Sequence, residues 1–248
     1  MFNLEYLATL RTAEIEKVTS WFRPGARVLE IGAGTGQQAQ AIAARGFPVE
    51  AIELASSNYA GARAFPITDY DGRHIPFPEA SFDIVFSSSV LEHVEDLDAL
   101  SREIRRVLRP GGTCIHVLPT HAWRFWTTLS EFPAALQYAW SVRGELLPRR
   151  GPRAFAAAWV GVGNRVARSV FQRRHGERGN VISEMRFFHP SWWRGEFRRQ
   201  GFAIVRDEPM GLFYTGNVAL GARWPLEKRA RLAKTLGSAC HLFELRPR

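Results

Sequence analysis

The chain has 248 residues, of which 46% are hydrophobic and 23% are charged, and its formal net charge is +9. This length and apolar content suit one large globular domain and exclude a disordered or fibrous protein. No run free of charged residues reaches the roughly 18 residues that a membrane-spanning helix needs. Residues 1–20 also lack the apolar core of a secretory signal, so we expect a cytoplasmic protein.

Strands and helices alternate through the first half of the chain. Leu4, Leu7, Ile15 and Val18 recur at near-helical intervals and predict an opening amphipathic helix. The elements expected after it are a strand at 27–31, a glycine turn at 32–36, a helix at 37–44, strands at 49–53 and 82–87, a helix at 97–108 and a strand at 112–118. Such alternation predicts a parallel sheet covered on both faces.

The alternation stops after Pro119 and returns near residue 201. We predict an insertion over 119–189 with no clear strand. Its expected parts are helices at 122–142 and 153–174, separated by a Pro- and Gly-containing break at 147–152. The elements expected after it are strands at 201–205 and 239–245, with a helix at 225–236 between them.

The insertion also concentrates the positive charge. Eleven of the 33 basic residues lie within it as arginines, against four glutamates, so seven of the nine net charges fall there. Aromatic residues accompany them, among them Trp123, Trp126, Trp140 and Trp159. This combination allows two interpretations: a lid over the substrate, or a surface for an anionic membrane or lipid carrier.

Two cysteines, Cys114 and Cys240, lie far apart in the sequence without a CxxC pair. No His/Cys cluster has the spacing of a zinc site, so neither a disulfide scaffold nor a bound metal is expected. We interpret both as reduced thiols of the core.

The glycine turn after the first strand indicates a ligand site. Glycines let the backbone approach a ligand, and the following helix offers free N–H groups. Gly32, Gly34 and Gly36 are spaced G-x-G-x-G, with Gln37 where a dinucleotide site needs its third small residue. NAD is therefore not expected. Three carboxylates (Glu30, Glu53 and Asp71) accompany the turn and suit a ligand rich in hydroxyls and amines.

The segment 28–36 (VLEIGAGTG) resembles motif I of class I S-adenosylmethionine-dependent methyltransferases. Further segments resemble the branch called methyltransferase type 11, which acts on small molecules and lipids. They are 70–78 (YDGRHIPFP), 81–85 (SFDIV), 91–94 (LEHV) and 108–112 (LRPGG). The resemblance implies an α/β fold: a Rossmann-like, seven-stranded, mostly parallel sheet in the order 3-2-1-4-5-7-6, with helices on both faces and a helical insertion, or lid, after strand five.

The resemblance also implies a division of the single domain, 1–248. Residues 1–21 would form the N-terminal helix, 22–118 the cofactor-binding half, 119–189 the insertion, and 190–248 the last strands of the sheet. Cys114 and Cys240 would then lie on neighbouring strands five and seven, close together yet reduced.

S-adenosylmethionine is the cofactor that the resemblance implies, with S-adenosylhomocysteine as the product. The three turn glycines would line its methionine and ribose part, Glu30 would orient the turn or the amino group, and Glu53 would bind both ribose hydroxyls. Asp71, followed by Gly72, would accept from the adenine amino group, with Asp69 as the alternative if the register shifts by two. Ser87 or Ser88 would offer a backbone carbonyl to the ammonium.

Three histidines are candidates for a catalytic role. A general base is optional in methyl transfer, but a hydroxyl acceptor profits from a histidine near the carboxyl ends of strands four and five. His93 and His121 fall there, and His175 lies in a polar stretch of the insertion. For His93, lining of the cofactor pocket is the alternative.

We expect a methyltransferase acting on a small-molecule or lipid-linked metabolite, at oxygen. An RNA methyltransferase that uses the Arg-rich insertion is an alternative, although no RNA-binding module is recognisable and nucleic acid is not the expected partner. A fold that binds without turnover is a third hypothesis. Contact with the inner face of an anionic membrane stays open, and the oligomeric state is not determined by the sequence.

Overall fold

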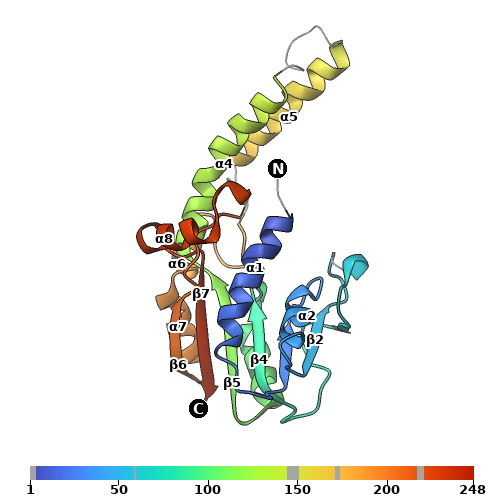
Figure 1. Ribbon diagram of the computed structural model, residues 1–248, viewed down its shortest axis with the longest axis vertical. Coiled ribbons are helices and arrows are strands. Elements are labelled where there is room, and N and C mark those ends of the chain that lie inside the picture. The colour runs from blue at the N-terminus through green and yellow to red at the C-terminus, as the bar shows by residue number, and fades with distance from the viewer. Residues whose placement is uncertain (1–3, 59, 144–150, 171–173, 217–220) are drawn as a thin grey trace.

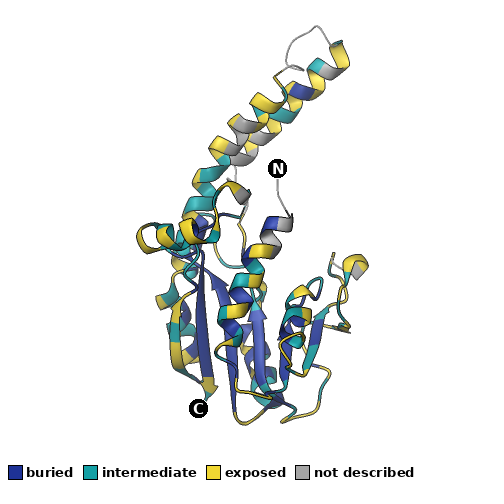
Figure 2. Cartoon of the chain, in the orientation of Figure 1, coloured by how far each residue is buried: buried dark blue, intermediate teal, exposed yellow. Residues whose placement is uncertain are grey.

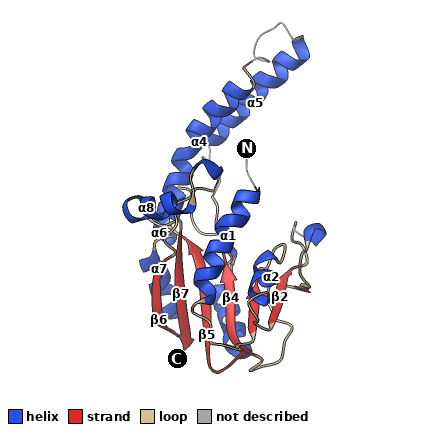
Figure 3. Cartoon of the chain, viewed as in Figure 1, coloured by secondary structure: helices blue, strands red, loops and turns tan. Residues whose placement is uncertain are grey.

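The computed structural model describes residues 4–58, 60–143, 151–170, 174–216 and 221–248. Its centre is one seven-stranded sheet in the order β3-β2-β1-β4-β5-β7-β6 (Figure 3). The strands are β1 (Val28–Ile31), β2 (Val49–Leu54), β3 (Thr68–Tyr70), β4 (Phe82–Ser88), β5 (Leu108–Pro119), β6 (Phe202–Pro209) and β7 (Cys240–Pro247). The pairs among β1 to β5 are parallel, and β7 is antiparallel to both neighbours. The expected fold class and strand order are confirmed.

Helices cover both faces of the sheet because successive residues of its central strands point to opposite sides. In β4, Ile84 and Phe86 enter one hydrophobic cluster together with Leu10 of α1, whereas Val85 enters a second cluster with Ile104 of α3. The α-helices are α1 (Leu4–Thr19), α2 (Gln37–Ala43), α3 (Leu97–Val107), α4 (His121–Ser141), α5 (Pro152–Val170), α6 (Glu184–Phe187), α7 (Pro190–Arg199) and α8 (Leu226–Leu236); the short 3-10 helices are η1 (Ala60–Ala62), η2 (Leu91–His93) and η4 (Gly221–Arg223).

Helix α7 is absent from our sequence-based expectation. It begins with Pro190 at its first turn, a position that suits proline, and His189 caps it by accepting the backbone N–H of Ser191. Its buried residues Trp193 and Phe197 pack under the sheet in the α3 cluster. The expected helices at 122–142 and 153–174 correspond to α4 and α5. Residues 171–173 and most of the expected break at 147–152 lie outside the described part of the chain.

Helices α4 and α5 lie side by side and project away from the sheet (Figure 1). We call them the α4–α5 hairpin. The hairpin projects away from the carboxyl ends of the strands, whereas Glu177 and Arg178 of the same insertion contact η2, which follows β4. Helical periodicity predicts that a helix has an apolar face, but it does not predict the surface against which that face packs. Here part of the apolar face of α4 packs on α5, and part of that of α5 packs on α4. Many of the hairpin's apolar side chains remain exposed (Figure 2): Phe125, Leu129, Phe132, Leu136, Tyr138, Trp140, Trp159, Val160 and Val166.

The two cysteines lie on neighbouring strands, as expected, but the expectation that they are close is wrong. In the antiparallel β5–β7 pair Cys114 lies opposite Leu245, and Cys240 lies opposite Pro119. Five residue steps of about 3.3 Å therefore separate them along the strands. Both are buried free thiols.

Among the described residues, no helix is long and apolar enough to cross a membrane.

Candidate active site

The glycine turn joins β1 to α2 at the carboxyl edge of the sheet. Gly32, Gly34 and Gly36 have φ angles of 71°, 57° and 80°, in the left-handed region that favours glycine. A Cβ on Gly32 would lie 2.4 Å from a methyl group of Val90, so the turn has no room for a side chain there. The N–H groups of Gly32 and Ala33 donate to the Ile52 carbonyl, so the turn is tied to β2 where α2 begins.

Glu53 lies beside this turn because β2 is the parallel neighbour of β1. One carboxylate oxygen of Glu53 accepts the backbone N–H of Gly34 at 2.6 Å, and the other accepts the N–H of Leu54 at 2.8 Å. The structure thus brings together the turn and the acid that the sequence assigns to one ligand.

Glu30 is 1% exposed and lies directly before the turn. Burial raises the pKa of its carboxyl to about 8, although the backbone N–H of Ala39 stabilises the charged form. Its Oε2 has no hydrogen-bond partner in the described part of the chain. An unsatisfied buried carboxylate oxygen is costly, so this position suits a cationic or N–H-bearing ligand group.

Asp71 and Asp69 differ in their surroundings. The Oδ1 of Asp71 accepts the backbone N–H groups of Arg73 and His74, both at 2.8 Å, and these bonds lower the pKa of this exposed carboxyl. Asp69 instead pairs with Arg63. Asp71 therefore begins the loop after β3 and keeps Oδ2 outside these two bonds, whereas Asp69 is engaged in an ion pair.

Tyr70 and Gly72 flank Asp71. Burial, followed by the charges of Glu53 and Asp71, raises the pKa of the Tyr70 hydroxyl to about 12. Our sequence analysis misses Tyr70, although its place between two acids of the site is a usable signal. Gly72 has φ 78°, and a Cβ there would lie 2.9 Å from Leu54.

Ser87 and Ser88 end β4. The Ser87 hydroxyl and Nδ1 of His116 lie 2.8 Å apart in a buried hydrogen bond, so this side chain is used inside the sheet. Burial lowers the pKa of His116 to about 3, which keeps its imidazole neutral. The Oγ of Ser88 is buried without a partner among the described residues. That a backbone carbonyl of Ser87 or Ser88 accepts from the cofactor's ammonium group stays a prediction.

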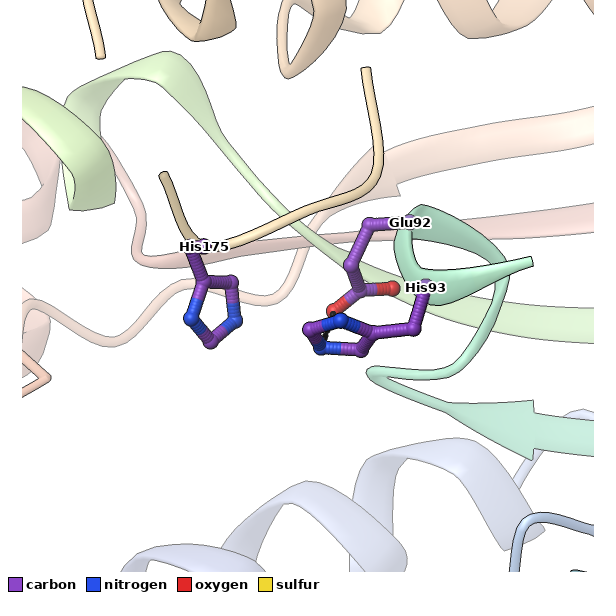
Figure 4. A group of neighbouring side chains, drawn as sticks. All are labelled: Glu92, His93 and His175. Atoms are coloured by element: carbon purple, nitrogen blue, oxygen red, sulfur yellow. Dashed lines mark ion pairs between the residues drawn. The ribbon is translucent and has the colours of Figure 1, made fainter. Parts of the chain in front are cut away.

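The structure brings two of the three candidate catalytic histidines together. The His93 and His175 ring centroids lie 4.8 Å apart, although the two residues come from η2 and from the segment after α5 (Figure 4). His121 pairs instead with His189, at 4.5 Å between ring centroids. Burial lowers the pKa of His93 and of His121, and that of His175 to about 4. Trp123 packs 4.7 Å from the His175 ring.

Glu92 is a third member of the His93–His175 group, and our sequence analysis does not single it out. Its carboxylate lies beside both imidazoles (Figure 4). Burial raises the pKa of Glu92 to about 8. The LEHV segment contains this residue, but only the fold shows that its side chain turns inward.

A buried ion pair positions His175. Arg124 of α4 lies 2.8 Å from the Glu184 carboxylate, and both side chains are nearly inaccessible. Glu184 in turn accepts the backbone N–H groups of His175 at 2.5 Å and of Gly176 at 2.7 Å. Neither Arg124 nor Glu184 was a candidate from the sequence, because sixty residues separate them and no local pattern links them.

Residues 29–116 match the profile of a family described as a methyltransferase domain. These residues include the glycine turn, Glu53, Asp71 and the LEHV segment. The match runs from within β1 to within β5 and ends before the α4–α5 hairpin.

Curated relatives share this half of the chain. The chain is 33% identical over 113 residues to the ubiquinone/menaquinone biosynthesis C-methyltransferase UbiE of Cupriavidus pinatubonensis, covering 41% of this chain and 46% of that protein. It is 35% identical over 139 residues to the ubiquinone biosynthesis O-methyltransferase of Xanthomonas campestris pv. campestris, covering 52% and 54%. The chain thus spans about half the length of the curated relatives it matches.

Solved structures share the fold over nearly the whole chain. A SAM-dependent methyltransferase from Archaeoglobus fulgidus superposes with a TM-score of 0.56 at 14% identity, covering 96% of this chain and 93% of that one. One from Mesorhizobium loti gives 0.54 at 18% identity, covering 94% and 97%. At these identities the likeness shows the fold alone. Residues 29–116 are therefore similar to a methyltransferase domain, and the chain shares its fold with S-adenosylmethionine-dependent methyltransferases.

Proposed function

We propose that the protein transfers a methyl group from S-adenosylmethionine to an oxygen of a small-molecule or lipid-linked metabolite. The observation that carries this proposal is the contact between Glu53 and the Gly34 backbone at the carboxyl edge of the sheet. It places the Glu53 carboxylate, with the buried carboxyl group of Glu30, beside the glycine turn that leads into α2. That donor and acceptor set fits a ligand with ribose hydroxyls and an ammonium group, without a diphosphate.

Each cofactor residue has a proposed role. S-adenosylmethionine supplies an electrophilic methyl group on its sulfonium when bound. Glu53 binds the ribose hydroxyls, the unpaired oxygen of Glu30 faces the amino group directly or through water, and Asp71 accepts from the adenine amino group. A backbone carbonyl of Ser87 or Ser88 accepts from the ammonium. The protein itself positions the acceptor against the methyl group and excludes water from the reaction.

The histidines lie where we place the molecule that receives the methyl group. A base with a pKa near 4 accepts a proton weakly at neutral pH, so His175 is better suited to contact than to proton transfer. His93 and His121 are the candidates for accepting the proton of a hydroxyl. Trp123, at 9% exposure, supplies an apolar wall beside His175.

The α4–α5 hairpin supports a lipid-linked acceptor and peripheral contact with an anionic membrane. Trp140 is 69% exposed near its outer end, and the Arg143 guanidinium lies 4.5 Å from the Trp140 ring centroid. Exposed tryptophan beside arginine suits the interface between acyl chains and anionic headgroups. The names of the curated relatives, which refer to quinone biosynthesis, agree with a lipid-linked substrate. A cytoplasmic protein at the inner membrane face is part of this proposal.

The test is methyl transfer from cofactor labelled in its methyl group. The purified chain is incubated with separate lipid, RNA and small-solute fractions of a bacterial lysate, with Glu53→Ala as the control. We expect label in the lipid or small-solute fraction, dependent on Glu53. Label in the RNA fraction would favour the RNA alternative, and no transfer to any fraction despite cofactor binding would favour the fold without turnover.

A further inference from the structure

Glu92, His93 and His175 form a compact group of potential metal ligands. One ligand atom from each lies within 4.8 Å of the other two (Figure 4). The Nε2 of His93 is 3.9 Å from Oε1 of Glu92, and the two imidazole rings are inclined by 67°. The group joins η2, at the carboxyl edge of β4, to the segment after α5. No sequence spacing reveals it, because His175 comes from a distant part of the chain.

The Glu92 carboxylate needs a partner. Its side chain is 0% exposed, and neither oxygen has a hydrogen bond within the described ranges. An unpaired buried carboxylate is strongly disfavoured, and buried charges are paired or coordinate metals. Its neighbour His93 is 41% exposed, which gives an ion a route from solvent to the group.

The cationic side chains described near the group are engaged by carboxylates or by backbone carbonyls. The charge of Arg124 acts on His175, but its guanidinium lies 2.8 Å from the Glu184 carboxylate. The charge of Arg11 acts on Glu92, and Arg11 pairs with Glu14 at 2.7 Å. Arg178 donates to the Leu91 and Val94 carbonyls beside the group, and the charges of Glu196 and Glu177 act on it. Glu177 and Glu184 favour a cation near His93. The charge around the group is therefore mixed rather than purely cationic.

The two halves of the group are held together by backbone contacts. The Glu177 N–H donates to the Glu92 carbonyl at 2.9 Å, and Arg178 donates to the Val94 carbonyl at 2.6 Å. The paired Glu184 fixes the His175 backbone from the other side. These hydrogen bonds thus hold the backbone on both sides of the three side chains.

We propose that Glu92, His93 and His175 bind one divalent first-row transition-metal ion, with Zn²⁺ as the best-fitting probe. Two imidazoles and one carboxylate are a known zinc set, and imidazole ligands favour such metals over Mg²⁺. Zn–N bonds of about 2.0 to 2.1 Å in tetrahedral geometry place ligand atoms about 3.3 Å apart. The largest separation between these ligand atoms, up to 4.8 Å, must shorten by about 1.5 Å, which side-chain rotations can supply. Three protein ligands leave a fourth position for an exogenous oxygen. When the ion is bound, His93 is a ligand, so His121 is the candidate base.

The test measures metal binding on the full chain without any cofactor. Chelator-treated protein is titrated with ZnCl₂ by calorimetry and by thermal unfolding, beside Glu92→Gln, His175→Asn and the control His74→Asn. His74 is an exposed histidine that contacts Glu103 at 2.9 Å away from the group. We expect one Zn²⁺ per chain and a raised Tm for the wild type and His74→Asn. Each ligand variant should lose at least tenfold in affinity, and MgCl₂ should leave the Tm unchanged.

Glu92→Gln separates metal binding from folding. Because it removes an unpaired buried carboxylate, we expect its metal-free form to be at least as stable as the wild type. Equal Zn²⁺ affinity in the wild type and His175→Asn would overturn the site, as would the absence of saturable binding. Titration of the same samples with S-adenosylmethionine distinguishes the two proposals, because loss of the metal site leaves cofactor binding intact and failure of cofactor binding leaves the metal result standing.

Discussion

The Glu53 carboxylate accepts the backbone N–H of Gly34 at 2.6 Å, across the carboxyl ends of β1 and β2. This bond fixes the acid against the turn before any ligand arrives. The second oxygen of Glu53 is likewise held, by the Leu54 N–H. A carboxylate restrained in this way loses little side-chain freedom when it binds vicinal hydroxyls, which favours affinity.

Glu53→Ala should weaken binding of S-adenosylmethionine by a few kcal/mol, because two charge-assisted hydrogen bonds of roughly 1.5 to 3 kcal/mol each are lost. Calorimetry measures the change in Kd. Glu50→Ala is the matched control, since Glu50 lies on the same strand but pairs with Arg27 at 3.2 Å. An unchanged Kd in Glu53→Ala would remove Glu53 from the site.

Asp71→Ala should weaken the cofactor less than Glu53→Ala and reduce discrimination against an inosine-type analogue that lacks the adenine amino group. The reason is that Asp71 is exposed, and one of its oxygens is already engaged by Arg73 and His74. Asp69→Ala serves as the control because Asp69 pairs with Arg63. If only Asp69→Ala changes the discrimination, then Asp69, two residues earlier, and not Asp71 binds the adenine amino group.

Glu30→Gln should stabilise the ligand-free protein more at high pH than at low pH. Burial raises the folded-state pKa of Glu30 to about 8 from an ordinary value of 4.5. The folded protein therefore holds this proton more tightly than the unfolded chain. The resulting stability is complete below about pH 4.5 and is lost as the pH rises through about 8. Glutamine stays neutral throughout.

Urea unfolding of both proteins at pH 5.5 and 8.5 checks this expectation. The advantage of Glu30→Gln should grow by an amount on the order of a few kcal/mol between the two pH values. Other titrating groups are common to both proteins and cancel in the difference. An advantage that is equal at both pH values would show that Glu30 is ionised in the folded state.

The two cysteines should resist disulfide formation even under mild oxidation. Their registers place Cys114 opposite Leu245 and Cys240 opposite Pro119, about 16 Å apart along the strands. A disulfide needs Cα atoms within about 7 Å. Mass measurement after alkylation in denaturant should find two modified thiols per chain. A stoichiometric intramolecular disulfide would contradict the β5–β7 register.

The α4–α5 hairpin should bind vesicles that contain anionic lipid. Flotation of the wild type should succeed with anionic vesicles, fade with added salt and fail with neutral ones. Joint replacement Leu136→Ser and Trp140→Ser should reduce binding more than tenfold, because each buried apolar side chain contributes about 1.5 to 3 kcal/mol. Arg143→Glu tests the charge, and Val205→Ser on β6, 48% exposed, is the control. Equal flotation of all variants would exclude the hairpin as the contact.

The sheet and the contact between Glu53 and the glycine turn were predictable because their signals are local. Three local features predict that β1 and β2 are parallel neighbours. They are a short apolar strand, a G-x-G-x-G turn after it, and an acid at the end of the next strand. The direction of the α4–α5 hairpin could not be predicted, because an apolar helical face does not identify the surface on which it packs. Helix α7 was missed because Pro190, which begins it, also interrupts helical patterns in the sequence.

The acceptor side could be predicted only in part. His93 and His175 were singled out, but their contact depends on the chain returning from α5 to η2. Sequence spacing could not identify Glu92, Arg124 or Glu184. Glu92 stands out only because its side chain is buried, and Arg124 and Glu184 only because they form an ion pair across the fold.

Calorimetric titration of the wild-type chain with S-adenosylmethionine and with S-adenosylhomocysteine tests the central claim most directly. The account predicts saturable binding of both at one site per chain, with NAD producing no heat because the turn lacks the third small residue of a dinucleotide site. The absence of saturable binding by either compound, in protein whose cooperative unfolding shows that it is folded, would contradict it.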